Sequence, residues 1–410
     1  MAVWMMRVVV LGEFRADRLV PPLRQGGAEV VVLASVVLES FLGPGVECGV
    51  LPTSLSEPAL LRLLADHGAD VAVPNLGCPG QEQFLPVYAR ATVGLRATGR
   101  RMPVHSERFA RLASDKVAFH ETAGRRGWPV PRAVVCAAAG AVREAARELG
   151  LPVLVKEARS EFHAGRHHVR DSHQLVRVCG EVSYPVLVQQ AVEGEEFAVE
   201  FLSGASYTVA WPVASLGRLD GDCAPGRRVR VAPAALPARA RAELTATVTD
   251  MVETSAPWGP WQMDFAVTDD GRLQVIELNG RLGGVSNMSW ASTGLDPHVA
   301  HVEAVLGRTS RRPRTERVAL ELPVHNGTVL PPAPSGTELM SFPGNPANRG
   351  PLIGGYQRAV LGAPVERAAS VREWLAALPE GVLLNSPKEA TVQLARGTYA
   401  LKHGGAPILP

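Results

Sequence analysis

A tight turn between two alternating runs is the sequence feature that most constrains the fold. Residues Trp261–Thr268 and Arg272–Leu278 alternate apolar and polar side chains, and the turn at 269–271 reads Asp-Asp-Gly. Alternation at every second residue is typical of a strand with one buried face, and Asp-Gly between two such runs is among the stronger hairpin signals. The sequence therefore predicts an antiparallel β-hairpin over these residues.

The carboxylates of this hairpin form a candidate magnesium site. Asp264 lies on the first strand, and Glu277 and Asn279 lie two residues apart on the second, so their side chains share one face. Carboxylate and amide oxygens suit Mg²⁺, and nucleotide phosphates complete its octahedron. Arg281, two residues further on, is placed to bind a phosphate or a carboxylate with two N–H groups. From these residues alone, the ordinary polar face of an exposed hairpin remains an equal alternative.

Lysine is scarce in this chain, where only Lys116, Lys156, Lys388 and Lys402 occur among 42 basic residues. A lysine carries a compact ammonium group on a flexible stem, whereas arginine carries a planar fork. Lys156 ends the apolar run 152–156 and precedes a loop rich in arginine and histidine. An ammonium group and loop amides in that position suit a phosphate group.

A second extended segment is predicted at 186–192. Its backbone C=O and N–H groups suit the edge of an adenine. Glu196 follows four residues beyond Val192, where a carboxylate can accept hydrogen bonds from ribose hydroxyls. Each of these features is weak when it is taken alone, and their order along the chain is more informative.

The first hundred residues predict a small parallel α/β domain. Arg7–Leu11, Val30–Leu33 and Val71–Pro74 are short apolar runs, and Ser56–His67 has apolar residues at helical spacing. Alternation of strands and helices is typical of a parallel sheet. No G-x-G-x-x-G follows the first run, so a dinucleotide-binding fingerprint is not supported.

The remainder of the chain predicts a mixture of helices and strands. Residues 105–150 are expected to be mostly helical, with helices over Glu107–Gly124 and Ala141–Leu149, and a β-rich stretch follows up to about 211. Further helices are expected over Ala235–Thr254 and His298–Leu306. The Pro- and Gly-rich residues 318–410 predict short strands and one helix, Val371–Leu378.

Composition narrows the class of protein further. The chain has 410 residues and a formal net charge of +2, whereas dedicated nucleic-acid binders carry a large basic excess. Its longest near-uniform apolar run, Val30–Leu38, is far shorter than the roughly 20 residues that span a bilayer. Five cysteines are dispersed without a C-x-x-C pair, and Arg7 interrupts the apolar start. We therefore expect no nucleic-acid or membrane partner, no signal peptide and a cytoplasmic location.

Taken in order, these features resemble the ATP-grasp superfamily of ligases over about residues 105–305. The most specific matches are Ser-Asp-Lys at 114–116, Gly-Trp-Pro-Val-Pro at 127–131 and Ile-Glu-Leu-Asn-Gly-Arg at 276–281. The layout is most similar to the branch with biotin carboxylase, carbamoyl phosphate synthetase and glycinamide ribonucleotide synthetase. Many carboxylate–amine ligases of natural-product pathways share it.

The resemblance implies a role for each matching residue. The lysines would bind the phosphates of ATP, the Gln190 carbonyl and the Val192 N–H would bind adenine, and Glu196 would bind ribose. The full set of ATP-binding residues would be Lys116, Lys156, Gln189, Gln190, Val192 and Glu196. The residues that would hold one or two Mg²⁺, or Mn²⁺, are Asp264, Glu277 and Asn279. The catalytic residues would be Lys156 and Arg281. The loop 281–287 would line the substrate site, with Arg281, Gly283, Gly284 and Ser286.

The resemblance also implies a domain organisation and a fold class, which is multidomain α/β and α+β. A pre-ATP-grasp α/β domain would span 1–104 and an ATP-grasp domain 105–307, with a β-rich lid at about 133–193. A small C-terminal α+β domain would span 318–410. Relatives carry several glycines in the loop after Lys156, but only Gly165 is present here, together with Arg159, Arg166, His163, His167 and His168. A zinc site at these histidines and His173 is a minor alternative, because no cysteine pair accompanies them.

The function implied is ATP-dependent activation of a carboxylate as an acyl phosphate, which an amine then converts to an amide. The expected partners are a small-molecule carboxylate and a small-molecule amine, with a homodimer as the candidate assembly. Biosynthesis of an antibiotic or another natural product is the expected context. Two alternatives stay open: carboxylation or thioester formation through the same intermediate, and a non-catalytic ATP-binding regulator.

Overall fold

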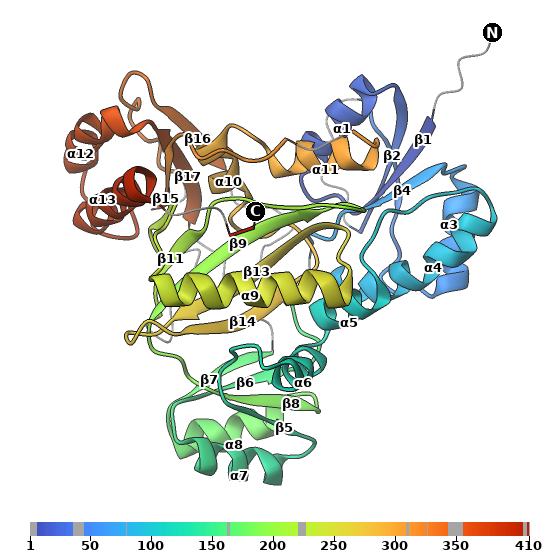
Figure 1. Ribbon diagram of the computed structural model, residues 1–410, viewed down its shortest axis with the longest axis horizontal. Coiled ribbons are helices and arrows are strands. Elements are labelled where there is room, and N and C mark those ends of the chain that lie inside the picture. Colours follow the sequence, from blue (N-terminus) through green and yellow to red (C-terminus); the bar gives the residue numbers. More distant parts are fainter. Residues whose placement is uncertain are drawn as a thin grey trace.

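The computed structural model describes residues 6–35, 45–78, 80–161, 165–219, 227–308, 311–325, 327–342, 356–404 and 408–409. Three sheets organise these residues (Figure 1). A parallel sheet lies at the upper right of the figure, a large sheet crosses the middle, and a four-stranded sheet with two helices lies at the bottom.

The first sheet has the strand order β3-β2-β1-β4, and all of its strand pairs are parallel. This confirms the parallel α/β unit predicted from the sequence. Ser56 caps α3 by accepting a hydrogen bond from the N–H of Ala59, and Pro58 is tolerated in the first turn. The elements of this unit are β1 (Met6–Leu11), α1 (Ala16–Gln25), β2 (Ala28–Ala34), β3 (Glu47–Val50), α3 (Glu57–Asp66), β4 (Val71–Pro74), η1 (Glu82–Phe84) and α4 (Leu85–Ala97).

Two short helices, α5 (Glu107–Ser114) and α6 (Lys116–Arg126), replace the single helix predicted over 107–124. Asp115 separates them in an extended conformation. Its carboxylate accepts hydrogen bonds from the N–H groups of Val117 and Ala118, which caps α6. The break matters for the site, because it places Lys116 at the first position of a helix.

The sheet at the bottom of Figure 1, here called the lid sheet, has the antiparallel order β5-β8-β6-β7. Its strands are β5 (Ala133–Cys136), β6 (Val153–Glu157), β7 (Arg166–Val169) and β8 (Val186–Gln190). One face packs on α7 (Ala139–Leu149) and α8 (Ser172–Glu181) through a cluster of buried aliphatic residues. The mostly helical prediction for 105–150 is confirmed, with the short strand β5 added, and α8 lies inside the stretch predicted as β-rich.

The large sheet contains nine described strands in the order β14-β13-β9-β11-β12-β15-β17-β16, with β10 paired to β9. The predicted hairpin is confirmed, since β13 and β14 pair antiparallel with Asp264 opposite Glu277 and Gln262 opposite Asn279. The strands from this part of the chain are β9 (Glu195–Ser203), β10 (Thr208–Ala210), β11 (Ala214–Arg218), β12 (Arg230–Ala232), β13 (Gly259–Val267) and β14 (Leu273–Asn279). The helices are α9 (Ala238–Ser255), α10 (Ser286–Thr293) and α11 (Pro297–Val305).

The C-terminal residues extend this same sheet. Strand β12 pairs with β15 (Val318–His325), which pairs with β17 (Tyr356–Ala363), and β17 pairs with β16 (Glu338–Phe342). The sequence predicted one helix here, over 371–378. The structure has η4 (Val365–Arg367) and two longer helices, α12 (Ala368–Ala376) and α13 (Pro387–His403), so the prediction missed α13.

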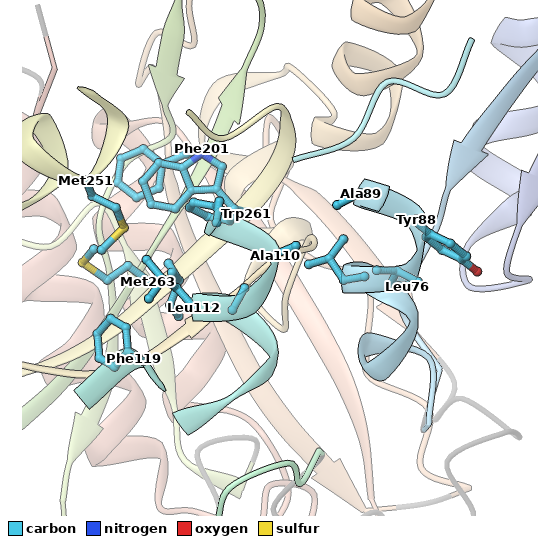
Figure 2. Close-up of a cluster of buried hydrophobic side chains, with 14 of the residues drawn as sticks. Leu76, Tyr88, Ala89, Ala110, Leu112, Phe119, Phe201, Met251, Trp261 and Met263 are labelled. Atoms are coloured by element: carbon cyan, nitrogen blue, oxygen red, sulfur yellow. The ribbon is translucent and has the colours of Figure 1, made fainter. Parts of the chain in front are cut away.

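The large sheet has one apolar and one polar face. On the apolar face, Trp261 stacks on Phe201 with ring centroids 3.9 Å apart, next to Met251 of α9 and Met263 (Figure 2). Burial of these side chains provides most of the local driving force. Because side chains alternate along a strand, the polar residues between them point to the other face. Among the described helices, none combines the length and apolarity needed for a transmembrane segment.

Candidate active site

The polar face of the large sheet gathers the predicted magnesium ligands around Asp264. Strand pairing places Asp264 directly opposite Glu277. Its two carboxylate oxygens accept hydrogen bonds from Asn279 Nδ2 at 2.9 Å and from Gln262 Nε2 at 2.7 Å. The structure therefore brings together all three of the predicted residues, Asp264, Glu277 and Asn279.

Asp264 lies among other carboxylates at this point. Burial of Asp264, with the nearby carboxylates of Glu277 and Glu196, raises the pKa of its carboxyl group to about 8. A divalent cation would offset the repulsion between these carboxylates, and the available donors are the hard oxygens that Mg²⁺ prefers. Within the described ranges no group of three or more His, Cys, Asp or Glu side chains forms a metal site. The oxygen donors of Asp264, Glu277 and Asn279 fit a magnesium ion, whose other ligands would come from nucleotide phosphates.

Lys116 and Lys156 approach the same acidic group from two other elements. Lys116 begins α6, and its ammonium group lies 3.1 Å from Glu277 Oε1 and donates a hydrogen bond to the backbone carbonyl of Ser160. Lys156 comes from β6 of the lid sheet and is buried. Burial and the opposite Arg166 of β7 lower the pKa of Lys156 to about 7. Both lysines line a cleft with Gln189, Ile276 and Glu277.

The predicted adenine segment lies beside this cleft. Gln189 is buried and its side chain lines the cleft, whereas Gln190, the last residue of β8, is exposed. The Gln190 N–H donates a hydrogen bond to the Arg132 carbonyl at 2.8 Å. Val192 follows outside the strand and is half-buried. At this end of β8 the chain leaves the lid sheet and continues to β9.

Glu196 lies on the polar face of β9 and forms a buried ion pair. Its Oε2 accepts a hydrogen bond from Arg228 Nη1 at 2.9 Å, and both side chains are 6% exposed. The carboxylate predicted to bind ribose is therefore oriented by an arginine that precedes β12. Arg228 itself was not identified from the sequence.

Arg281 joins the site to the first domain. Its guanidinium group forms a hydrogen-bonded ion pair with Glu82 of η1, and Nη1 also donates to the Leu282 carbonyl at 3.1 Å. Both charged side chains of the pair are largely buried. Glu82 thus holds Arg281 close to Glu277 and Asp264, and no local sequence signal linked Arg281 to Glu82.

Glu200 anchors the loop that follows β14. This buried carboxylate accepts hydrogen bonds from the Gly283 N–H at 3.1 Å and from the hydroxyls of Ser286 and Ser289 at 2.6 Å each. Gly283 packs against Gln262 so closely that a Cβ atom would lie 1.9 Å from its Oε1. Of the predicted substrate residues, Gly283 and Ser286 are buried, whereas Gly284 is exposed and accepts hydrogen bonds from Arg230 and Arg358.

For two of the site residues that the sequence analysis did not identify, the sequence contains a usable signal. Gln262 stands two residues before Asp264, and Glu200 stands four residues after Glu196, so the strand period places each on the polar face. Glu82 and Arg228 had no such signal, because only the tertiary fold brings them to their partners.

The histidine-rich loop provides part of the lid sheet. His167 and His168 lie on β7, opposite Val155 and Leu154 of β6. His163 lies outside the described residues. Gly165 adopts a φ of +60°, and a Cβ atom there would lie 2.7 Å from the Glu157 carboxylate, so glycine is favoured at this position.

The fold is that of ATP-grasp proteins, which confirms the resemblance found in the sequence. No protein-family model matches the chain. The D-alanine–D-alanine ligase of Pseudomonas fluorescens is 27% identical over 305 residues, covering 71% of this chain and 87% of that protein. The carbamoyl phosphate synthase large chain of Methanothrix thermoacetophila is 24% identical over 292 residues, covering 69% of this chain.

The large chain of carbamoyl phosphate synthase is much longer than this protein, which spans only 27% of it. Among solved structures, the biotin carboxylase of Campylobacter jejuni in a β,γ-ATP complex superposes with a TM-score of 0.69 at 15% identity. That superposition covers 98% of this chain and 97% of the other. The likeness therefore extends over all three sheets, including the C-terminal strands.

Proposed function

We propose that this protein is an ATP-dependent ligase that activates a carboxylate and joins it to an amine. The observation that carries the proposal is the convergence of five predicted side chains from three elements. Lys116 of α6 lies 3.1 Å from Glu277 of the hairpin, Asn279 donates to Asp264 at 2.9 Å, and Lys156 of the lid sheet lines the same cleft. The D-alanine–D-alanine ligase is a relative whose name describes this class of reaction.

In this proposal the site works by positioning and by neutralising charge. Lys116 and Lys156 bind the phosphates of ATP, and Arg281, held by Glu82, binds the transferred phosphoryl group. Gln189, Gln190 and Val192 bind the adenine, and Glu196 binds the ribose. Asp264, Glu277 and Asn279 would hold Mg²⁺, or Mn²⁺ in its place, which neutralises the charge of the phosphates.

The proposed chemistry has two steps. A carboxylate oxygen of the substrate attacks the γ-phosphorus, the bond to the β,γ-bridging oxygen breaks, and ADP leaves. The amine then attacks the carbonyl carbon of the acyl phosphate, phosphate leaves with the C–O electron pair, and the nitrogen loses a proton. The exposed Gly284 and the buried Gly283 and Ser286 would shape the site of the carboxylate.

An acyl phosphate is hydrolysed readily, so the site must exclude water. In the structure, the Glu161 carboxylate, from the segment between β6 and β7, accepts hydrogen bonds from the N–H groups of Gly80 at 2.7 Å and Gln83 at 3.1 Å. These contacts tie the lid segment at 133–193 to the first domain. We infer that they hold the lid closed over the nucleotide.

The finer expectations from the sequence belong to the same proposal. They include the domain boundaries at 104 and 318, natural-product or antibiotic biosynthesis, a cytoplasmic location and a homodimer. Four of the five cysteines lie in the described residues and are free thiols, in keeping with a reducing compartment. Small-molecule carboxylate and amine substrates are the proposed partners.

Carboxylation is the second candidate. It is favoured by the superposition on biotin carboxylase, which covers nearly the whole chain. In that case ATP would activate bicarbonate in place of an organic carboxylate, and the intermediate would be carboxyphosphate.

The deciding experiment measures ADP release with MgATP and a panel of carboxylate and amine pairs, amino acids first, with bicarbonate as a separate arm. A ligase releases ADP only when both substrates are present, and hydroxylamine in place of the amine traps the acyl phosphate as a hydroxamate. Glu277→Gln should abolish this turnover. The control Asp270→Asn removes an exposed carboxylate at the tip of the same hairpin and should retain it. Tight ATP binding without turnover in every arm would instead identify a regulator.

A further inference from the structure

A second cavity lies on the apolar face of the large sheet, away from the nucleotide cleft. It has a volume of about 370 Å³, within the usual range for small-molecule sites. Its floor comes from Phe197, Ser215 and Val231, which lie directly opposite one another on β9, β11 and β12. Cross-strand neighbours point to the same face, so these three side chains form a continuous surface.

Two helix regions form the walls of this cavity. Ala234 and Ala235, just before α9, line one side, and Ala395, Arg396 and Tyr399 of α13 line the other. Helix α13 is held firmly against the sheet, because a Cβ atom on Gly397 would lie 2.5 Å from Val231 Cγ2. The cavity is therefore a defined space beside a well-packed helix, and it does not arise from loose packing of α13.

The cavity carries one charge of each sign at its edge. The Glu195 carboxylate accepts hydrogen bonds from the Ser215 hydroxyl and from the guanidinium group of Arg396. The Arg396 side chain is 49% exposed, whereas that of Glu195 is 18% exposed. Because the Arg396 side of this ion pair is open to solvent, the pair is weak and a ligand can enter between its two groups.

We propose that this cavity binds a free α-amino acid with an apolar side chain. Its ammonium group would be held by Glu195 and Ser215 and its carboxylate by Arg396, while its side chain would lie among Phe197, Val231 and the two alanines. An amino acid gives Glu195 a new cation and Arg396 a new anion when it separates them. A simple amine or a simple acid would leave one of the two groups without a partner. The wall of alanines leaves room for a branched aliphatic or aromatic side chain.

The site is distinct from the substrate site of the proposed ligase. Glu195 and Phe197 point to the apolar face of β9, whereas Glu196, between them, points to the polar face and pairs with Arg228. Strand β11 is bulged between Ser215 and Gly217, where β9 and β11 pair irregularly. Bulges of this kind are frequent beside binding sites, because they redirect single side chains.

The test is isothermal titration of the full chain, without ATP, with L-leucine and L-phenylalanine. We expect binding of one of them at micromolar to millimolar concentration, and at least tenfold weaker binding of 3-methylbutylamine and 4-methylpentanoate, which each lack one charge of leucine. Ala395→Trp should fill the cavity and abolish binding. Val392→Trp, at an exposed position outside the cavity on the same helix, should retain it.

Two further measurements separate this site from the catalytic one. Binding should persist in Glu277→Gln and in the presence of saturating MgADP, whereas Glu195→Gln and Arg396→Gln should each weaken it at least tenfold. Thermal melting of each variant checks that it is folded. Absence of amino-acid binding to the unmodified protein, or binding that Glu277→Gln abolishes and Ala395→Trp leaves intact, would overturn the proposal.

Discussion

Lys156 shows how a single residue can be costly for the fold and useful for the site. It is buried in β6, and desolvation together with Arg166 lowers the pKa of its ammonium group to about 7. A charged group that is buried without a full complement of partners destabilises the folded state. A phosphate at this position would stabilise the charged form and raise the pKa again.

Replacing Lys156 by Met should therefore separate stability from activity. We expect the thermal midpoint to stay the same or rise, because the buried ammonium group is removed. The affinity for MgADP should fall about tenfold or more, the loss expected for one hydrogen bond to a charged group. Calorimetric melting and titration with MgADP measure the two effects. Lys402→Met, at an exposed position of α13, is the control; a lower midpoint with unchanged ADP affinity would contradict this role.

The raised pKa of Asp264 predicts that binding of magnesium depends on pH. Its pKa of about 8, raised by burial and by two neighbouring carboxylates, means that the ligand-free protein holds a proton there at pH 7. A metal ion binds the deprotonated form, so binding of MgADP at pH 7 should release up to one proton. Titrations in two buffers with different ionisation enthalpies measure this release. Asp264→Asn should lower the net number of protons released, because the uptake by Lys156 then stands alone, whereas Asp270→Asn should not change it. An unchanged proton count in Asp264→Asn would refute the assignment.

The raised pKa of Asp264 also determines how the stability of the ligand-free protein changes with pH. Between about pH 4 and 8 the folded protein binds more protons at Asp264 than the unfolded chain does, because the folded pKa is the higher one. This group therefore makes the ligand-free protein less stable as the pH rises through that window. Bound MgADP should remove that part of the pH dependence.

At the scale of elements, the β13–β14 hairpin was predictable because its signals are local. The Asp-Gly turn and the alternating runs depend only on backbone preference and on burial of one face. Gly271 adopts a φ of +79°, where a residue with a Cβ atom is disfavoured. The space around it is open apart from an ordinary contact with Pro237 at 3.9 Å.

Gly271→Ala should therefore lower the free energy of unfolding by about 1–2 kcal/mol, the cost of the left-handed conformation. Gly124→Ala provides a control of opposite sign. Gly124 lies inside α6 with nothing within 4 Å of the added atom, and alanine there should stabilise the protein by about 1 kcal/mol. Denaturant unfolding curves give both values. Equal effects of the two substitutions would contradict the argument.

Elements whose position depends on tertiary contacts were predicted less well. Strand β5, helix α8 and helix α13 were missed, although their residues carry no unusual composition. The break between α5 and α6 depends on Asp115 as a cap, which a purely periodic reading of 107–124 overlooks. Periodicity describes which face of an element is apolar, and the neighbours that cover this face decide whether the element forms.

At the scale of the whole molecule, Glu161 connects the lid segment with the first domain through two backbone N–H groups. Both hydrogen bonds are exposed to solvent, so each contributes only about 0.5–1.5 kcal/mol. Glu161→Ala should therefore favour an open lid and weaken MgADP binding about tenfold. Titration with MgADP measures this, and Glu148→Ala, which removes an exposed lid carboxylate, should leave the affinity unchanged. Equal affinities in both variants would show that the latch is not needed for closure.

The sequence alone determined the hairpin, the first parallel sheet and the identity of the residues around Asp264, because these depend on local spacing and residue chemistry. The tertiary structure decided which partners orient those residues. Arg281 is held by Glu82 from the first domain, and Glu196 is held by Arg228, although the members of each pair are far apart along the chain. Pairing across such separations follows from the packing of whole elements, which no local pattern in the sequence encodes.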